Sequence, residues 1–271
     1  MLATSVETHQ DGRRLRVARI GHGPPLVLLH GYPENLQIWC EVALRLADDF
    51  EVIAFDWPGM GYSDAWSGGA TPIHQAGRLR LLLDTWGIER AGIIGTDMGG
   101  EPALVFGARY PERCRHLVIM NSLVQWDAAT SWEIRTLRHY RWNNLILSRL
   151  PWAVFLRAER TFLPRGIKLP PDLRADMWNS FKQPEVRRFI VRMCAGYQAQ
   201  LPRLPEMAKH IACPALILWA DHDAHFPKAQ AEWLHSRIAG ARLEIVQGTE
   251  HWMAWHRPDE VAQRIHAFVA S

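Results

Sequence analysis

Short apolar runs rich in β-branched residues recur along the chain and predict a sheet. From residue 25 onward these runs are apolar throughout, which is typical of parallel strands buried on both faces. The segments between them have apolar residues at helical spacing, and several begin with proline near the first turn. The predicted strands are Leu15–Ile20, Pro25–His30, Glu51–Phe55, Ala91–Gly95, Leu117–Met120, Ala215–Trp219 and Leu243–Val246. The predicted helices are Trp39–Asp48, Pro72–Trp86, Met98–Arg109, Pro227–Ile238 and Pro258–Val269.

The alternation of strand and helix predicts an α/β fold with a mostly parallel, doubly wound sheet. It stops after Asn121, and the stretch up to about Pro205 is helical, rich in Arg and Trp, and broken by prolines. We expect residues 122–205 to form an inserted helical cap, and residues 1–121 and 206–271 to form the core domain. The 271 residues suffice for one such domain with its insertion.

Composition narrows the classes of partner. Hydrophobic residues make up 48% and charged residues 22%, as in ordinary globular proteins. The net charge is only +3, with Lys and Arg scattered, so we expect neither nucleic acid nor a membrane surface as a partner. A small, largely apolar substrate fits better. The choice between a monomer and a homodimer stays open.

The cysteines predict neither a zinc site nor disulfides. Cys40, Cys114, Cys194 and Cys213 form no CxxC pair and lie far apart in the sequence, so they are expected to be reduced thiols. The first residues lack an apolar signal region, and no stretch has the length of a membrane span. These features favour the cytoplasm.

An aspartate occupies the central position of a motif that usually holds serine. Gly95-Thr96-Asp97-Met98-Gly99 follows a strand and begins a helix, which is the setting of the Gly-x-Ser-x-Gly nucleophile elbow. The two glycines permit the tight turn, and the helix N-terminus favours a negative charge. Taken alone, such a turn is equally consistent with an ordinary helix cap.

Further segments make the chain resemble the α/β-hydrolase superfamily over nearly its whole length, within it the epoxide hydrolases and the haloalkane or haloacetate dehalogenases. His30–Glu34, followed by Trp39, is similar to the His-Gly-x-Pro-Glu loop of that group, and the segment 56–64 is similar to a structural turn. The segment 219–223 resembles the turn that holds the acid, and the segment 248–251 resembles the histidine loop.

The resemblance implies a role for each matching residue. Asp97 is the expected nucleophile and His251 the base, with Asp223 as the acid and Asp221 as the fallback. Their order along the chain is the one that this fold requires. The resemblance also implies an oxyanion hole made by the backbone N–H groups of Tyr32 and Met98.

A carboxylate nucleophile changes the expected chemistry. Aspartate has a reference pKa of about 3.9, so it is ionised at neutral pH without help from a base. It suits displacement at a saturated carbon, which would leave an alkyl ester of Asp97. His251, oriented by Asp223, would then activate water to hydrolyse that ester.

The residues after Asp97 disfavour a halide leaving group. Dehalogenases of this branch usually have Trp or Arg directly after the nucleophile, where this chain has Met98. Haloacetate dehalogenases bind the substrate carboxylate with a second Arg a few residues on, in a stretch that here contains Glu101. An anionic substrate would be repelled.

An epoxide needs a proton donor, and epoxide hydrolases supply two tyrosines from the cap. Tyr140 and Tyr197 are the only tyrosines in the inserted segment and fit that expectation, although cap tyrosines are also common packing residues. His139 leaves an ambiguity, because haloacetate dehalogenases use a cap histidine nearby. The expected pocket residues are His30, Glu34, Trp39 and His139.

The sequence therefore predicts a hydrolase that opens an epoxide to a vicinal diol, without cofactor or metal. A haloalkane or haloacid dehalogenase with the same Asp97 nucleophile is the alternative enzyme. A non-catalytic ligand-binding protein with the hydrolase fold is a third hypothesis, in which Asp97 merely replaced a lost serine. The intact acid and histidine positions argue against this third hypothesis.

Overall fold

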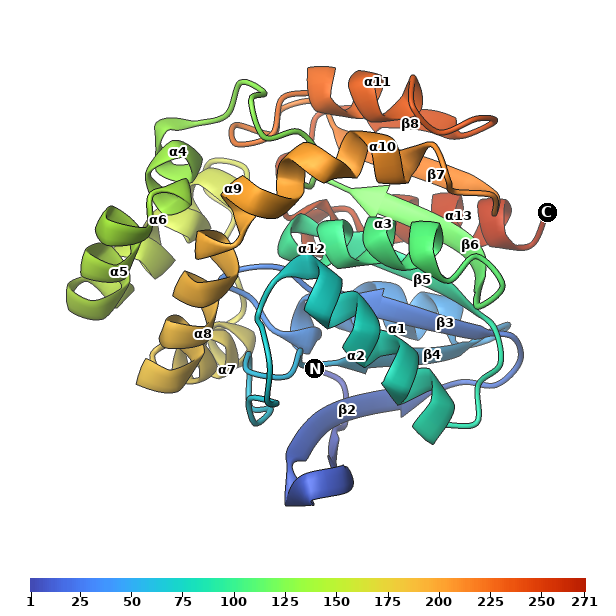
Figure 1. Cartoon of the computed structure of the whole chain (residues 1–271), viewed down its shortest axis with the longest axis horizontal. Helices are drawn as coiled ribbons and strands as arrows, with labels where there is room; N and C mark the ends of the chain where they lie inside the picture. The colour runs from blue at the N-terminus through green and yellow to red at the C-terminus, as the bar shows by residue number, and fades with distance from the viewer.

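The computed structural model describes the backbone of residues 1–271 and all side chains except those of Gln10 and Tyr140. Its strands form one eight-stranded sheet in the order β1-β2-β4-β3-β5-β6-β7-β8 (Figure 1). The β1–β2 and β2–β4 pairs are antiparallel, and the remaining pairs are parallel. The strands are β1 (Ser5–Thr8), β2 (Arg14–Ile20), β3 (Pro25–Leu29), β4 (Glu51–Phe55), β5 (Ala91–Thr96), β6 (Cys114–Met120), β7 (Ala215–Ala220) and β8 (Arg242–Val246). The predicted fold class, a mostly parallel α/β sheet, is confirmed.

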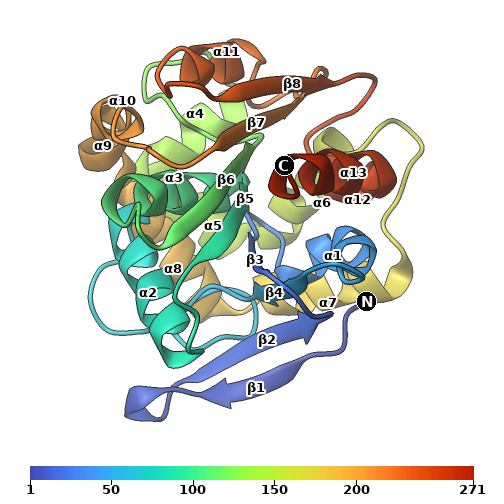
Figure 2. The ribbon, with the colours of Figure 1, turned by 90° about the vertical axis from the view of Figure 1, so that its right-hand side faces the viewer.

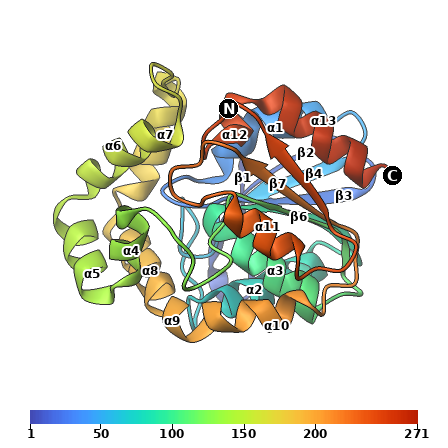
Figure 3. The ribbon, with the colours of Figure 1, turned by 90° about the horizontal axis from the view of Figure 1, so that it is seen from above.

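Helices cover both faces of the sheet. Helices α1 (Cys40–Leu46), α12 (Met253–His256) and α13 (Pro258–Val269) pack together on one face (Figure 2). Helices α2 (Pro72–Thr85), α3 (Gly100–Arg109) and α11 (Ala229–His235) lie on the other (Figure 3). The short 3-10 helices are η1 (Gln10–Gly12), η2 (Leu36–Trp39), η3 (Asp97–Gly99) and η4 (Leu201–Arg203).

A helical segment joins β6 to β7, and its helices α4 to α8 lie beside the sheet, at the left of Figures 1 and 3, while α10 packs on α3. It contains α4 (Trp132–Arg138), α5 (Tyr140–Arg149), α6 (Pro151–Phe162), α7 (Pro171–Phe181), α8 (Pro184–Ala195), α9 (Tyr197–Gln200) and α10 (Leu204–Ala208). Because the segment leaves from the carboxyl end of β6, it lies at the edge where parallel strands present their functional loops. Among the described residues, no helix combines the length and apolarity needed to cross a membrane.

Most predicted elements agree with the structure, and the differences have local causes. The N-terminal hairpin strand β1 is missing from the prediction because its four residues are mostly exposed and polar. Helix α13 has the predicted bounds, with proline at its first position. Helix α3 begins at Gly100 instead of Met98, because the tight turn η3 precedes it.

A shared carboxylate fixes the helical segment to the core. Asp176, in α7, accepts hydrogen bonds from the Arg16 guanidinium at 3.0 and 3.1 Å and from the Asn35 amide at 2.7 Å. The Tyr62 hydroxyl donates to the backbone carbonyl of Asp176 at 3.2 Å. Asp176 is therefore linked to three separate segments of the core.

Arg16 also pairs with a carboxylate inside the core. Its guanidinium lies 3.6 Å from Asp56, which is fully buried at the end of β4. The two oxygens of Asp56 accept backbone N–H groups from Leu36 and Tyr62, each at 2.8 Å. Asp56 thereby fixes both the loop after β3 and the turn after β4, which supports the structural role expected for the segment 56–64.

Replacement of Asp56 by alanine is expected to lower the free energy of unfolding by about 3 kcal/mol, because it leaves a buried guanidinium with one partner fewer and two buried N–H groups unpaired. Urea denaturation followed by circular dichroism measures this. Glu206→Ala, which breaks an exposed pair with Lys209, is the control and should leave the midpoint unchanged. Equal effects of the two substitutions would contradict the structural role of Asp56.

Candidate active site

Asp97 occupies a strained turn between β5 and α3. Its backbone has φ of 49°, a left-handed value that is rare for residues other than glycine. A Cβ at Gly95 would collide with the carbonyl of Gly99, and one at Gly99 would collide with the carbonyl of Leu29. The Ser122 hydroxyl donates to the Asp97 carbonyl at 2.7 Å. The turn therefore depends on small residues on both sides and directs the carboxylate over the strand ends.

His251 lies between two carboxylates that come from distant parts of the chain. Its Nδ1 is 2.7 Å from Asp223 Oδ2, and its Nε2 is 3.3 Å from Asp97 Oδ2. The other Asp223 oxygen accepts the backbone N–H groups of His225 and Phe226 at 2.8 and 2.9 Å. The structure thus brings together Asp97, Asp223 and His251, which the sequence predicted as nucleophile, acid and base.

Asp221, the fallback for the acid, does not contact His251. One of its oxygens accepts the backbone N–H of Thr249 at 3.1 Å, and the other lies 3.6 Å from the ring of His222. The geometry therefore favours Asp223 as the partner of His251.

The loop after β3 supplies an N–H group to Asp97. The backbone N–H of Tyr32 donates to Asp97 Oδ1 at 2.8 Å. The Glu34 carboxyl accepts the N–H of Gly31 at 2.8 Å and holds this loop in shape. A Cβ at Gly31 would collide with the Asp97 side chain, so only glycine permits this approach. The second predicted oxyanion group is the backbone N–H of Met98. Met98 lies in η3 directly after Asp97, which is a suitable position for stabilising a negative charge.

Burial and charge set the protonation of the site. Burial opposes the positive charge of His251, but the Asp223 and Asp97 carboxylates outweigh it and raise the pKa of His251 to about 10. Burial, and after it the charge of Asp97, raises the pKa of Glu34 to about 8. At neutral pH the site therefore contains an imidazolium between two carboxylates, with Glu34 largely neutral.

A small cavity adjoins Asp97. Its volume of ≈ 30 Å³ is enough for about one water molecule. The residues that line it with polar or charged side-chain groups include Asp97, Glu101, Arg138 and Tyr197. Its remaining walls are Tyr32, Met98, Leu123, Ile134, Leu137, Ile190, Cys194 and Phe226. Tyr197 belongs to the helical segment, so the structure brings this predicted proton donor to the same cavity as Asp97.

A second cavity of ≈ 290 Å³ shares Tyr32, Ile134 and Leu137 with the first. Its walls are mainly apolar and come largely from α4 and α6, which includes Phe162, together with His225. An apolar substrate group can therefore occupy the larger space while its reacting atoms face Asp97.

The residues predicted to line the pocket do not lie on the walls of these two cavities. His30 and Trp39 are fully buried and line neither of these two cavities. The ring of His30 contacts the carbonyl of Gly31 and the N–H of Trp57, which is a structural role. His139 is exposed and does not line the cavities either, and Glu34 lies behind the loop rather than on a cavity wall. The side chain of Tyr140 lies outside the described side chains.

Sequence reasoning missed several residues of the site. Arg138 and Cys194 give no signal, because their spacing within the helical segment reflects only tertiary packing. His225 had a signal, since it follows Asp223 by two residues. Its ring contacts the Ser131 and Thr161 hydroxyls at 2.7 and 2.8 Å, and burial lowers its pKa to about 4, so it acts as a neutral link between helical segment and core.

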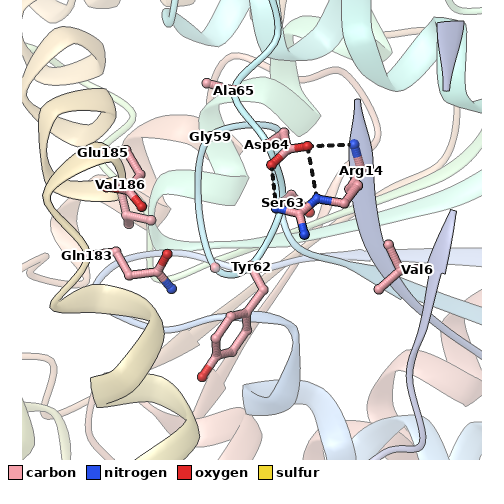
Figure 4. Close-up of a pocket in the computed structure, with 11 residues that line it drawn as sticks. Val6, Arg14, Gly59, Tyr62, Ser63, Asp64, Ala65, Gln183, Glu185 and Val186 are labelled. Atoms are coloured by element: carbon pink, nitrogen blue, oxygen red, sulfur yellow. Dashed lines mark hydrogen bonds and ion pairs between the residues drawn. The ribbon is translucent and has the colours of Figure 1, made fainter. Parts of the chain in front are cut away.

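Another cavity of ≈ 290 Å³ lies away from Asp97, between the turn after β4, the first two strands and the start of α8 (Figure 4). Arg14 and Asp64 form an ion pair of 3.1 Å along its wall. None of the predicted catalytic side chains lines it. Among the described residues, no cluster of three or more His, Cys, Asp or Glu side chains is arranged to hold a metal ion.

Comparison with known proteins identifies the family of the chain. The chain matches the α/β hydrolase fold family over residues 24–258 and therefore belongs to that family. Epoxide hydrolase 3 of Mus musculus is 27% identical over 283 residues, covering 96% of this chain and 74% of the relative. A 2-hydroxy-6-oxononadienedioate/2-hydroxy-6-oxononatrienedioate hydrolase of Paraburkholderia phymatum is 27% identical over 279 residues, covering 97% and 94%.

The solved structure of the epoxide hydrolase CorEH superposes with a TM-score of 0.83 at 21% identity, covering 100% of this chain and 99% of that one. At this identity the likeness establishes the fold alone. The relatives catalyse more than one hydrolytic reaction, so the chain is a hydrolase-fold family member whose particular reaction follows from its own site.

Asp97→Asn is expected to lower the pKa of His251, because the imidazolium loses one of its two carboxylate neighbours. Asp223→Asn should lower it further, since Asp223 also accepts the Nδ1–H hydrogen bond. Histidine NMR titrations of both variants and the wild type measure these values. An unchanged pKa in Asp97→Asn would show that Asp97 and His251 are not coupled.

The same shift predicts a pH dependence of stability. The pKa of His251 is raised above an unfolded value of about 6.5, so its stabilisation is complete below that pH and is lost as pH rises through about 10. The free energy of unfolding of the wild type should therefore fall more over this interval than that of His251→Gln. Parallel slopes in urea denaturation at several pH values would contradict this.

Proposed function

We propose that the protein is an epoxide hydrolase that forms a covalent alkyl ester on Asp97 and releases a vicinal diol. The observation that carries this proposal is the position of the Asp97 carboxylate. One oxygen contacts the Tyr32 N–H, the other faces His251, and the carboxylate shares a cavity with the Tyr197 hydroxyl. The similarity to Epoxide hydrolase 3 of Mus musculus over 96% of this chain supports the same reaction.

In the first step an oxygen of Asp97 attacks one carbon of the epoxide. The carbon–oxygen bond of the ring breaks, and its electron pair goes to the leaving oxygen, which takes up a proton from an acid of the cavity. The hydroxyl of Tyr197 contacts that oxygen in this proposal. The helical segment acts as the cap, because it supplies Tyr197 and closes the site from solvent.

In the second step water hydrolyses the ester. Once Asp97 is esterified its charge is gone, so the pKa of His251 falls. The imidazolium then gives its proton to the acid that lost one in the first step, and the neutral imidazole can take a proton from water. Asp223 holds the ring through Nδ1. The water attacks the Asp97 carboxyl carbon, and the N–H groups of Tyr32 and Met98 stabilise the oxyanion. Collapse releases the diol and restores Asp97.

One observation favours the alternative, a dehalogenase. Arg138 lines the cavity, and although its terminal nitrogens donate to Trp126 and Thr130, its Nε has no hydrogen-bond partner among the described residues. A halide could be held there, although Met98 occupies the position that usually solvates it. The apolar neighbouring cavity suits either an epoxide or a haloalkane with a hydrophobic substituent.

His251→Gln is expected to trap the alkyl-enzyme, because the step that uses the base is blocked. The variant should be incubated with small aryl and alkyl epoxides and, separately, with bromoalkanes, and its intact and peptide masses recorded. We expect an adduct equal to the whole mass of the epoxide on the peptide that contains Asp97. The double variant Asp97→Asn, His251→Gln is the control and should give no adduct.

Each other result has a distinct meaning. An adduct only from bromoalkanes, without bromine, would replace the epoxide hydrolase with the dehalogenase. The absence of an adduct from both, together with binding of an apolar ligand, would contradict covalent catalysis and favour the non-catalytic binding protein.

A further inference from the structure

Two buried oxygen atoms at the cavity of Asp97 have no hydrogen-bond partner among the described residues. They are Oε2 of Glu101 and the hydroxyl oxygen of Tyr197, whose residues are 1% and 4% exposed. Both residues line the same cavity of ≈ 30 Å³. Unpaired buried polar atoms are unfavourable and uncommon. The two groups also lie beside each other, close enough to influence each other's pKa, so an oxygen of a ligand between them would accept a hydrogen bond from each.

Glu101 is positioned to act on the reacting atoms. It is the second residue of α3 and follows Asp97 by four positions, so its carboxyl lies beside Asp97 above the end of β5. Burial, and after it the charge of Asp97, raises the pKa of Glu101 well above its usual range. These surroundings favour the protonated form of Glu101, which is the form that can donate a proton.

The surroundings of Tyr197 oppose the loss of its proton. Burial raises the pKa of its hydroxyl well above 10, and the neighbouring Glu101, Cys194 and Asp97 raise it further. A phenolate in this cavity would be costly, whereas a hydrogen bond from the intact hydroxyl would not. The cation Arg138, at the cavity wall, is the one other charged group that faces this space besides Asp97.

We propose that Glu101 is a catalytic residue that gives its proton to the leaving oxygen of the epoxide, while the Tyr197 hydroxyl holds that oxygen by a hydrogen bond. This inference rests on the proposed function and assigns to a carboxylic acid the part expected of a second tyrosine. As the Asp97–carbon ester bond forms and the ring carbon–oxygen bond breaks, the proton moves from Glu101 to the oxygen. The negative charge thereby passes from Asp97 to Glu101, and the cavity gains no net charge.

The proton balance closes over the whole reaction. His251 gives up its proton to the Glu101 carboxylate through water in the cavity, which restores Glu101 and leaves the imidazole neutral for the second step. His251 takes a proton from the attacking water and returns it to the departing alkoxide of the diol. Asp97 is left as a carboxylic acid and passes its proton to His251, which restores the resting charges.

The test compares two leaving groups in the His251→Gln background, where only the first step occurs. The rate of adduct formation is measured by intact mass with an aryl epoxide and with a benzylic bromide, whose bromide leaves without a proton. Adding Glu101→Gln, which keeps the shape of the neutral acid, should slow the epoxide reaction by about 10²–10⁴-fold. The bromide reaction should change only a few-fold. Glu159→Gln, which alters an ion pair with Arg174 in the helical segment, is the matched control.

Two further measurements make the result decisive. Adding Glu101→Asp instead, which keeps an acid, should recover part of the epoxide rate. Infrared difference spectra of the single variant Glu101→Gln against the wild type should show the loss of one protonated carboxyl band at neutral pH. Equal slowing of epoxide and bromide, an unchanged epoxide rate, or no such band would overturn the role of Glu101. If His251→Gln alone formed no epoxide adduct, the proposed function would fail first, and this inference with it.

Discussion

The burial of two carboxylates around one imidazole is the constraint on which the site depends. Asp97 and Asp223 come from loops after different strands, and at this burial two negative charges would repel each other strongly without the His251 cation between them. Burial, and after it the charge of Asp97, raises the pKa of both Glu34 and Glu101 and favours their protonated forms. The triad thus separates the acids that hold a charge from those that favour holding a proton.

Most of the frame that carries this triad could be predicted from the sequence. The buried strands are continuous apolar runs, and the glycines around Asp97 mark a turn that larger residues cannot form. Because carboxyl ends of parallel strands meet at one edge of the sheet, Asp97, Asp223 and His251 are brought together by topology alone. The exposed strand β1 was missed, since its polar sequence leaves no periodic signal. The helix predicted over Pro227–Ile238 is present as α11, but it spans only Ala229–His235.

The cavity walls were predicted less well, for a physical reason. They come from helices whose orientation depends on tertiary contacts, so the sequence gives no indication that Arg138 and Cys194 face Asp97 while His139 faces solvent. His30 and Trp39 resemble pocket residues in sequence but are buried behind the loop. The sequence analysis identified Glu101 because it lies four residues after Asp97. Its protonation depends on burial, which only the three-dimensional structure reveals.

The contacts of Asp176 limit how the helical insertion can be exchanged between members of this family. A helical insertion is often regarded as a module that can be exchanged between relatives to change specificity. Here one carboxylate of α7 serves Arg16 and Asn35 of the core at once. A transplanted insertion without an acid at this place would leave the Arg16 guanidinium with only Asp56, so any chimera must carry α7 and its recipient residues together. The boundary for recombination therefore follows an ion pair and not the ends of the insertion in sequence.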